Sequence, residues 1–446
     1  MATYQLTSAD LVTLLSSTSS PGTSGAVIQY LVDTNGLPGG SGAPPTVESL
    51  TSTSGGSETL PGAQVEVINV PSGTSATFNF NSPGGSLIVA GNEATTVFDS
   101  SSGTDTLIGG SGNERLVSTV GNNVLIGGTG QNTLIGGSGS DSLTGGGDSR
   151  LVAGTGSQVL TGGTIAGAHD TLIGGSGADV LKVTMGDNRL VGGSGVNTLY
   201  GGSGNDTLLG GGHSSMVAGT GANTLQGGLM AGASDTLIGG SGADKLIVHM
   251  GNNSLVGGSG QNTLLGGSGN DTLIGGGDSR VVGGSGSDTL VASSSPSGSD
   301  TLVGGSGPDN LIATVGNNRL IGGSGMDTLT AGSGHDTLVS GKGDVSMVGG
   351  AGMFRAVDTT GANATLVGGA GGGRAVLGTT GNDSVMGGSG SISIASQQSS
   401  TDLVSNSSTA MGGLHTLTFS DGQTIVVNDV NSNITIHFAD GGHTSV

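Results

Sequence analysis

One apolar position recurs about every nine residues along most of the chain, and glycine-rich polar segments separate its occurrences. In the first full block, leucine holds this position each time: Leu107, Leu116, Leu125, Leu134, Leu143, Leu151 and Leu160. A nine-residue period with a Gly-rich turn in every unit does not fit an α-helix. We predict a short strand around each leucine and a turn in each Gly-rich segment, where glycine supplies positive φ angles. Stacked units of this kind predict an all-β fold, a right-handed parallel β-solenoid.

A longer period contains the short one. The tetrapeptides Asp-Thr-Leu-Ile or Asp-Thr-Leu-Val begin at Asp105, Asp170, Asp235 and Asp300, at a constant 65-residue interval. Each 65-residue block therefore holds seven strands. A unit with only one or two apolar residues can bury them only against its neighbours, so the repeat predicts a thin core along the stack.

The number of strands in each turn depends on which residues stack. The position two residues before the leucine reads Asp, Asp, Asn, Asn, Asp, Ser, Asn in the second block. Steps of three strands group like residues, which side-chain ladders favour, so a three-sided helix is favoured and a two-sided roll stays open. The three-sided form stacks two acidic runs, one of Asp179, Asp206 and Asp235 and one of Asp244, Asp271, Asp300 and Asp327. The two-sided form has as its best acidic column Asp271, Asp288, Asp309 and Asp327.

The N-terminal flank divides into three parts. Residues 1–32 are predicted to hold a short helix over 9–16, capped by Thr7 or Ser8. Residues 33–62, rich in Gly, Pro, Ser and Thr, are predicted to be an irregular linker. Residues 63–104 contain short apolar runs that are predicted to be strands leading into the solenoid: Val65–Val70, Thr77–Phe80, Leu87–Ala90 and Thr96–Phe98.

The solenoid is predicted to span residues 105–390, and residues 391–446 to cap it. In this last segment, Leu414–Ser420 and Gln423–Val430 flank Asp421-Gly422, a pattern that predicts a β-hairpin. The ends of a solenoid need atypical units to cover the last strands, so both flanks are expected to serve partly as caps.

The composition agrees with a thin core and limits the classes of binding partner. Glycine supplies 97 of 446 residues, aromatic residues are 2%, and cysteine and tryptophan are absent. The formal net charge of −21 makes nucleic acid and anionic membranes poor partners and divalent cations good ones. No apolar stretch approaches the roughly 18 residues of a membrane span. The first residues lack the basic start and apolar core of a secretory signal peptide.

The repeat resembles a known family at the residues that define it. Gly136-Gly-Ser-Gly-Ser-Asp141-Ser-Leu143, Gly201-Gly-Ser-Gly-Asn-Asp206-Thr-Leu208 and Gly266-Gly-Ser-Gly-Asn-Asp271-Thr-Leu273 resemble the nonapeptide of the hemolysin-type, or repeats-in-toxin (RTX), calcium-binding family. The resemblance implies Ca²⁺ bound between neighbouring turns by turn carbonyls and the Asp carboxylate. It also implies type I secretion from a bacterium, guided by a C-terminal signal, and an extracellular or cell-surface location.

The candidate calcium ligands are the aspartates of the repeat and of its margins: Asp105, Asp141, Asp170, Asp179, Asp206, Asp235, Asp244, Asp271, Asp288, Asp300, Asp309, Asp327, Asp336 and Asp383. About half of the repeats have Asn, Ser, Gln or Glu at the same position, as at Asn123, Asn132, Ser149 and Gln158. Calcium prefers several oxygen ligands with carboxylates among them. Calcium is therefore expected at some places along the solenoid and not at all of them.

Catalytic patterns are lacking. His169, His213, His249 and His335 are scattered through the repeat without the His-Glu-x-x-His spacing of a zinc site, and His415, His437 and His443 are expected on the surface. No serine lies in a nucleophile elbow between a strand and a helix. The sequence predicts that the protein is not an enzyme.

The predicted function is that of a secreted, calcium-binding structural protein that assembles with copies of itself into a surface layer, fibre or matrix. Aliphatic residues after the leucine, such as Ile108, Val117 and Ile126, would form apolar stripes if they point outward. Alternatives are a surface-binding solenoid, such as an ice-binding or adhesive protein, and a secretion or folding module. Threonines such as Thr106 and Thr133 would suit ice, but Arg115, Arg189, Lys245 and Arg319 occupy the same repeat position and would break a regular plane.

Overall fold

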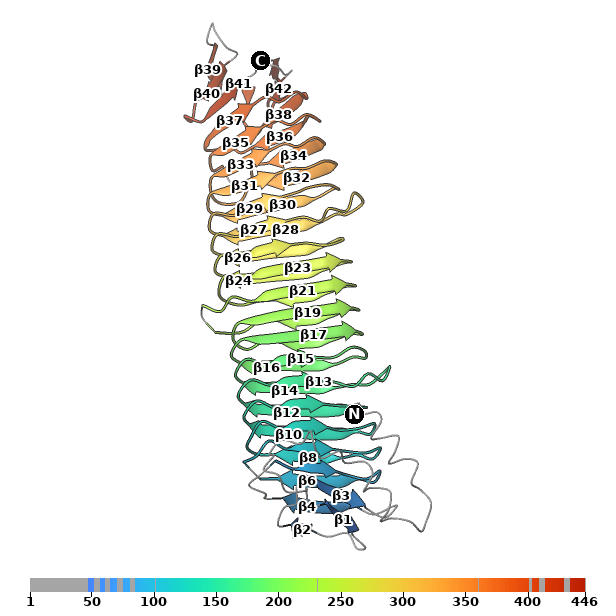
Figure 1. Ribbon diagram of the computed structural model, residues 1–446. Coiled ribbons are helices and arrows are strands. Elements are labelled where there is room, and N and C mark those ends of the chain that lie inside the picture. The colour runs from blue at the N-terminus through green and yellow to red at the C-terminus, as the bar shows by residue number, and fades with distance from the viewer. Residues whose placement is uncertain are drawn as a thin grey trace, which may run out of the picture. The chain divides into compact units, whose positions relative to one another are not determined.

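The computed structural model is all-β, and its described residues contain no α-helix. It describes residues 47–51, 57–60, 65–69, 75–80, 85–100, 102–230, 232–359, 361–400, 403–408, 414–428 and 434–445. The helix predicted over 9–16 lies outside these residues. The chain forms two compact units, Met1–Ala218 and Gly219–Val446, and the boundary falls within strand β19 (Ser214–Thr220). Each unit is a parallel β-solenoid in its own right (Figure 1).

Two parallel sheets form unit 1, one of odd-numbered and one of even-numbered strands. The odd sheet contains β1 (Val47–Thr51), β3 (Val65–Asn69), β5 (Leu87–Val89), β7 (Thr106–Ile108), β9 (Val124–Ile126), β11 (Ser142–Thr144), β13 (Val159–Thr161), β15 (Val180–Lys182) and β17 (Asn197–Ser203). The even sheet contains β2 (Ser57–Leu60), β4 (Ala76–Phe80), β6 (Thr95–Asp99), β8 (Arg115–Ser118), β10 (Asn132–Ser138), β12 (Ser149–Thr155), β14 (Thr171–Ser176), β16 (Arg189–Ser194) and β18 (Thr207–Leu209).

Unit 2 repeats the arrangement. Its odd sheet contains β21 (Thr236–Ser241), β23 (Ser254–Ser259), β25 (Thr272–Ile274), β27 (Thr289–Val291), β29 (Asn310–Ile312), β31 (Asp327–Thr330), β33 (Val345–Val348), β35 (Ala364–Val367), β37 (Asn382–Met386), β39 (Leu403–Ser408), β40 (Leu414–Phe419) and β41 (Thr424–Asn428). Its even sheet contains β20 (Thr224–Gln226), β22 (Lys245–Ile247), β24 (Thr263–Ser268), β26 (Arg280–Ser285), β28 (Thr301–Ser306), β30 (Arg319–Ser324), β32 (His335–Val339), β34 (Met353–Val357), β36 (Gly373–Leu377), β38 (Ile392–Ser396), β42 (Ile434–His437) and β43 (His443–Ser445).

Each coil of the solenoid holds two strands. Leu107 of β7 is in register with Leu125 of β9, and Leu125 with Leu143 of β11, so a leucine stacks on the second leucine after it in the chain. The favoured three-sided helix is therefore wrong, and the two-sided roll is the fold. The premise that like residues stack failed because stacked carboxylates repel, whereas a two-strand step separates most aspartates by a neutral side chain.

Because each 65-residue block contains an odd number of strands, a given repeat position changes sheet from one block to the next. Seven strands at two per coil make three and a half coils, so successive blocks begin on opposite sheets. Leu107 of the first block lies in the odd sheet, and Leu172, its counterpart in the second block, lies in β14 of the even sheet. The same repeat position therefore faces opposite ways in neighbouring blocks.

The core is one leucine wide on each sheet. All seven leucines of the first block have no exposed surface, and most residues on either side of them are more exposed, with Ile108 and Val117 as buried exceptions. Side chains alternate across a strand, so the inward set consists of the leucine and the residue two positions before it. The predicted thin core is confirmed.

The N-terminal lead-in is part of the solenoid. The four predicted strands are β3, β4, β5 and β6, and they are confirmed. β5 pairs with β7 and β6 with β8, so the sheets continue without a break across the predicted boundary at residue 104. The prediction of an irregular linker is wrong for Val47–Thr51 and Ser57–Leu60, which form β1 and β2 and pair with β3 and β4. The linker was predicted from a composition rich in turn-forming residues. This composition does not distinguish a linker from the solenoid, because every coil of this fold is also rich in such residues.

A hairpin ends the odd sheet of unit 2, as predicted. β40 and β41 pair in antiparallel fashion around Asp421-Gly422, where Gly422 has a φ of 90°. β41 also pairs in parallel with β37, so the hairpin covers the last coil. On the even sheet, β42 pairs with β38 and then with β43.

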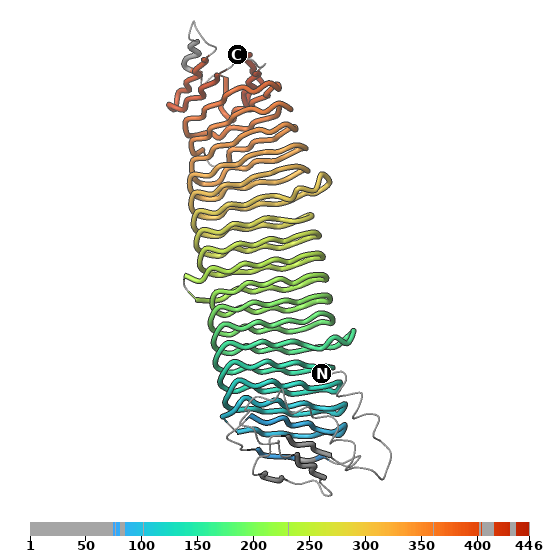
Figure 2. The backbone as a smooth tube through the Cα atoms, viewed as in Figure 1, coloured from blue at the N-terminus to red at the C-terminus, as the bar shows by residue number. Residues whose placement is uncertain are grey.

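Three loops lengthen single coils at 65-residue intervals: 162–169, 227–234 and 292–299. In unit 2, loop 227–234 leads from the even to the odd sheet and loop 292–299 from the odd to the even sheet, so they leave from opposite edges. Both can be followed in the backbone trace of Figure 2. They account for the longer steps between successive leucines, such as Leu160 to Leu172.

Candidate metal centre

An inward ladder of polar side chains runs beside each leucine column. The residue two positions before the leucine is buried in almost every repeat, whether it is Asp, Asn, Ser, Gln or Glu. In most coils its side-chain oxygen accepts the backbone N–H of the equivalent residue one coil earlier, as in Asp105 N–H to Oδ1 of Asn123 at 2.8 Å. The ladder thus satisfies buried backbone donors at the point where each strand begins.

In unit 1 the ladder alternates acids with neutral residues. Asn123 N–H donates to Asp141 Oδ1, Asp141 N–H to Gln158 Oε1, and Gln158 N–H to Asp179 Oδ1. Asp179 N–H then donates to Oδ1 of Asn197. Each carboxylate of this column therefore has a neutral neighbour above and below it, which reduces like-charge repulsion.

Unit 2 contains a column of four successive acids on its odd sheet. Asp271 N–H donates to Asp288 Oδ1 at 2.8 Å, Asp288 N–H to Asp309 Oδ1 at 2.9 Å, and Asp309 N–H to Asp327 Oδ1 at 3.0 Å. All four side chains are at most 3% exposed. This is the column expected for a two-sided roll, and we call Asp271, Asp288, Asp309 and Asp327 the acidic column.

The second carboxylate oxygen of three of these residues makes no hydrogen bond. Oδ2 of Asp271, Asp288 and Asp309 is buried without a partner among the described residues. The same holds for Asp141 and Asp179 in unit 1. A buried carboxylate oxygen without a donor is costly unless a proton or a cation satisfies it.

In the acidic column, a backbone carbonyl of the next coil lies beside the same open space as Oδ2 of Asp271, Asp288 and Asp309. A carbon placed on Gly266 would lie 2.8 Å from Asp271 Oδ2 and 2.5 Å from the carbonyl oxygen of Gly283. A carbon on Gly304 would lie 2.5 Å from both Asp309 Oδ2 and Gly322 O. In the acidic column, the first glycine of the Gly-Gly pair, at Gly266, Gly283 and Gly304, therefore leaves open a space that two oxygens of adjacent coils share.

Burial raises the pKa of these carboxyls. It raises the pKa of Asp271 to about 6, with repulsion from Asp288 as a smaller cause in the same direction. It raises the pKa of Asp309 to about 7, again with smaller contributions from Asp288 and Asp327. The pKa values of Asp288 and Asp327 are also raised by burial. The charged form of the column therefore needs a compensating positive charge.

The donor set fits calcium. Ca²⁺ takes carboxylate and backbone carbonyl oxygens, and it tolerates varied geometry. The acidic column offers both kinds of oxygen from successive coils, in a space closed to side chains by glycine. In the described residues no group of three or more His, Cys, Asp or Glu side chains converges, so backbone carbonyls have to supply part of any coordination shell.

Three of the candidate ligands use Oδ2 to bind the backbone of a long loop. Asp170 accepts Ser149 N–H with Oδ1 at 2.8 Å and Gly163 N–H with Oδ2 at 2.8 Å. Asp300 accepts Ser279 N–H and Ser293 N–H in the same way, and Asp235 Oδ2 accepts Gly228 N–H at 2.9 Å. Each second oxygen fastens the first residues of one of the long loops. These aspartates use Oδ2 for the backbone, so we assign them to the loops and not to calcium.

The remaining candidates are distributed as follows. Asp206 and Asp244 accept backbone N–H groups of Asn188 and Asn223 on the even sheets of their units. Asp336 accepts Asn318 N–H with Oδ1 and Gly332 N–H with Oδ2, so both of its oxygens bind the backbone. Asp383 accepts Ala364 N–H on the odd sheet of unit 2, separated from the acidic column by Val345 and Ala364. Asp105 begins the unit 1 column described above.

The two acidic runs predicted for a three-sided helix do not exist. Asp179 lies in the odd sheet of unit 1 and Asp206 in the even sheet. Asp244 and Asp300 lie on the even sheet of unit 2, away from Asp271 and Asp327 on the odd sheet.

The sequence did not single out which turn carbonyls lie beside the acidic column, those of Gly283, Gly304 and Gly322, nor that Gln158 accepts a backbone N–H as Asn does. It also missed the role of Asp170 and Asp300, although one signal was present. Both follow a repeat that has lost its regular nine-residue length.

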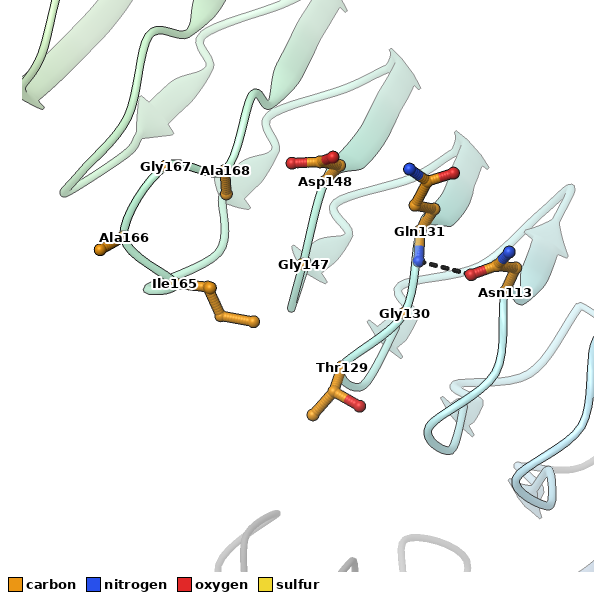
Figure 3. A pocket seen from close by; sticks show the side chains of 10 residues that line it. All are labelled: Asn113, Thr129, Gly130, Gln131, Gly147, Asp148, Ile165, Ala166, Gly167 and Ala168. Atoms are coloured by element: carbon orange, nitrogen blue, oxygen red, sulfur yellow. Dashed lines mark hydrogen bonds between the residues drawn. The ribbon is translucent and has the colours of Figure 1, made fainter.

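A shallow hollow of about 320 Å³ lies on a turn edge of unit 1, beside loop 162–169 (Figure 3). Its lining includes Asn113, Gln131 and Asp148. Gln131 N–H donates to Asn113 Oδ1 and His169 N–H to Asp148 Oδ1, both at 2.8 Å. The polar side chains of this hollow thus form an outer ladder that joins successive turns, and its one carboxylate has no second acid or base beside it in the lining.

Comparison with known families agrees with the ladder. The family model of the RTX calcium-binding nonapeptide repeat matches residues 91–125, 117–152, 166–182, 184–212, 231–264, 248–282, 275–295, 297–329, 312–347, 330–352 and 376–391. These segments together cover more than half of the chain. A comparison with curated proteins finds no matching sequence. No helix among the described residues is long and apolar enough to cross a membrane.

Proposed function

Because this chain belongs to the family of RTX calcium-binding nonapeptide repeat proteins, we propose that it is a secreted, non-catalytic structural protein that calcium orders outside the cell and that then assembles with copies of itself. The family is typically structural or binding rather than catalytic, and its members generally leave the cell by type I secretion. Residues 391–446 would then hold both the cap and the export signal.

The acidic column carries the proposal. Asp271, Asp288, Asp309 and Asp327 stack without a neutral residue between them, and three have a second oxygen without a donor among the described residues. Unfolded, these carboxylates are hydrated and far apart. Folding brings them together, so calcium that binds only the folded column adds its binding free energy to stability. Calcium sites of extracellular modules bind at roughly 10⁻⁴–10⁻³ M, which allows folding to wait until export.

When bound, calcium would supply positive charge between the coils, and the chain would supply the oxygen ligands. Asp271, Asp288, Asp309 and Asp327 would hold it together with the carbonyls of Gly283, Gly304 and Gly322. Asp141 and Asp179 in unit 1 are weaker candidates, because their columns alternate with neutral residues.

Self-assembly is supported by outward aliphatic residues. The position after the leucine lies on the outer side of the strands, and in unit 2 it forms a column on the odd sheet: Ile238, Val256, Ile274, Val291 and Ile312. Ile274 is 38% exposed. In unit 1, by contrast, Ile108 and Val117 are only 7% exposed. A regular apolar column on a sheet face favours lateral association.

Circular dichroism and electron microscopy test the proposal on the full chain. Addition of calcium to chelator-treated protein is expected to increase the β-signal and the melting temperature, and then to produce sheets or fibres. An unchanged melting temperature would reject calcium-driven ordering. Persistent monomers after a normal calcium response would reject self-assembly alone.

Ice binding gains support from one observation. The bases that argued against it, Arg115, Arg189, Lys245 and Arg319, all lie on even sheets. The odd sheet of unit 2 instead presents an outward column without charge: Thr236, Ser254, Thr272, Thr289, Asn310, Thr328, Ser346 and Thr365. Inhibition of ice recrystallisation by the calcium-loaded protein would favour this second candidate, and its absence would reject it.

A further inference from the structure

All seven arginines of the chain occupy one repeat position on one kind of sheet. They precede the inward residue of an even-numbered strand: Arg115, Arg150 and Arg189 in unit 1, and Arg280, Arg319, Arg355 and Arg374 in unit 2. Lys245 of β22 has the same position. Only Lys182, on the odd sheet of unit 1, and Lys342, in a turn, lie elsewhere. We call the outer side of each even sheet the basic face.

The bases form a row with regular spacing. In unit 2 the strand register places Arg280 against Thr301, Thr301 against Arg319, Arg319 against Thr337, and Thr337 against Arg355. Unit 1 alternates in the same way from Arg115 through Arg150 to Arg189. Adjacent strands are about 4.8 Å apart, so these alternating bases recur at roughly 10 Å, whereas Arg355 and Arg374 at the end of the row lie on adjacent strands.

Copying of a single 65-residue block does not explain the row. A shift by one block changes the sheet, and it carries Arg115 to Val180 and Arg189 to Ser254, which are uncharged and lie on odd sheets. A shift by two blocks restores both the sheet and the charge: Arg115 corresponds to Lys245, Arg150 to Arg280, and Arg189 to Arg319. The charge therefore follows the face and the two-block period that returns to it, and not the single block.

The basic side chains are available to a partner. Arg150, Arg189, Arg280, Arg319 and Arg355 are exposed, and within the described residues none of them forms an ion pair. Arg115 differs, since its guanidinium lies 4.7 Å from the centre of the Phe98 ring.

The nearest acids do not neutralise the row. Asp148, Asp187 and Asp278 lie two residues before Arg150, Arg189 and Arg280, on the turns. Each accepts a backbone N–H from the next coil: His169 to Asp148, Asn205 to Asp187, and Ser299 to Asp278. Most repeat aspartates point inward into the ladders. A protein with net charge −21 thus presents a local row of positive charge on each even sheet.

An aliphatic column borders the row. Two residues beyond each base or intervening threonine of the row, the same strands carry Val282, Val303, Ile321, Val339 and Val357 in register. These side chains are half-buried. A partner of this face therefore meets a line of guanidinium groups and, beside it, a line of methyl groups.

We propose that the basic face binds a linear acidic polysaccharide whose carboxylates recur along the polymer. The planar guanidinium binds carboxylates with two parallel hydrogen bonds, and arginine stands at seven of the eight basic positions. A polymer with a uronic acid at every second sugar matches a base on every second strand, and the C–H faces of its sugar rings can cover the aliphatic column.

Other partners fit the face less well. Nucleic acid carries a phosphate about every 3.4 Å along each strand, a spacing much shorter than that of the bases in the row. A second copy of the chain would need a matching row of exposed acids, and the exposed turn acids of the described residues are too few and too widely spaced. The proposal goes beyond the proposed function, since polymer binding requires neither self-assembly nor calcium at the face.

The proposal is tested by titration of the full-length, calcium-saturated protein with hyaluronan, which has one carboxylate per disaccharide. Neutral dextran serves as the reference polymer. The wild type is expected to bind hyaluronan and not dextran, with an affinity that falls as salt rises. The double variant Arg280→Gln, Arg319→Gln is expected to lose about tenfold in affinity. The matched control, Lys182→Gln with Lys342→Gln, changes net charge equally and is expected to keep wild-type affinity.

The proposal is overturned by no binding of the wild type to hyaluronan, by equal binding to dextran, or by equal weakening in both double variants. Melting curves of the variants verify that each is folded. Sedimentation of the variants without polymer separates this face from self-assembly. If the arginine variant stops assembling yet binds hyaluronan like the wild type, the face serves a second copy of the chain and the polysaccharide proposal fails.

Discussion

The backbone N–H of Asp288 donates a 2.9 Å hydrogen bond to Oδ1 of Asp309, one coil further along the odd sheet of unit 2. This bond holds two buried carboxylates in adjacent coils, while Oδ2 of each has no donor among the described residues. One oxygen of each aspartate thus supports the backbone, and the other is left for a proton or a cation. The expected behaviour of the protein in solution follows from this division.

The first prediction concerns pH without calcium. The pKa of Asp309 is raised from 3.8 to about 7 and that of Asp271 to about 6, chiefly by burial. A carboxyl with a raised folded pKa stabilises the fold below its unfolded pKa, and this stabilisation is lost as pH rises through the folded pKa. The melting temperature in chelator is therefore expected to fall between about pH 4 and about pH 7. A melting temperature that rises over this interval would contradict the assignment.

Calcium is expected to reverse this trend. Its affinity for the acidic column should increase with pH, because the ligands must lose their protons to bind it. Melting temperatures measured with and without calcium should therefore diverge as pH rises above about 6. Curves that stay parallel from acid to neutral pH would show that protons and calcium do not share the column.

Removal of two charges from the acidic column should separate its structural role from its metal role. The variant Asp288→Asn, Asp309→Asn can keep the Oδ1 acceptors of the ladder and loses two buried charges. We expect it to melt higher than the wild type in chelator at neutral pH and to gain less from calcium. The matched control is Asp187→Asn, Asp278→Asn, on exposed turns, which should preserve the wild-type calcium response.

The loop aspartates should respond in the opposite way. Asp300 accepts Ser293 N–H with Oδ2 at 2.7 Å, so Asp300→Asn can place an amide donor against this N–H. We expect a loss of about 1–3 kcal/mol of stability, equal in calcium and in chelator, as measured by denaturant unfolding. A loss that appears only with calcium would make Asp300 a ligand after all.

Glycine at the shared space can be tested with alanine. A methyl group on Gly283 would clash with Oδ2 of Asp288 and lie 2.7 Å from Gly304 O, so Gly283→Ala is expected to abolish part of the calcium-induced rise in melting temperature. Gly275 is the matched control, because its added carbon would lie 3.4 Å from Ser279 Cβ, an ordinary contact. Equal calcium responses of the two variants would place the cation elsewhere.

Much of the acidic column could be predicted from the sequence. Asp271, Asp288, Asp309 and Asp327 follow from the nine-residue period once a coil holds two strands, and the structure confirms this stacking. The error lay in the expectation that like residues stack. Asp141 above Gln158 and Asp179 above Asn197 show why it failed, since a neutral oxygen accepts the backbone N–H as well as a charged one does and avoids repulsion.

The sequence by itself determined the local unit: a strand around each leucine, a turn at each Gly-rich segment, an inward Asp position and a hairpin at the end. These features depend on near neighbours in the chain, so the nonapeptide encodes them. Only the tertiary structure decided which units meet, because closure of a coil brings together residues 17 to 21 positions apart. That closure makes the fold two-sided, separates the calcium candidates Asp271 to Asp327 from the loop residues Asp170 and Asp300, and gathers every arginine on the even sheets.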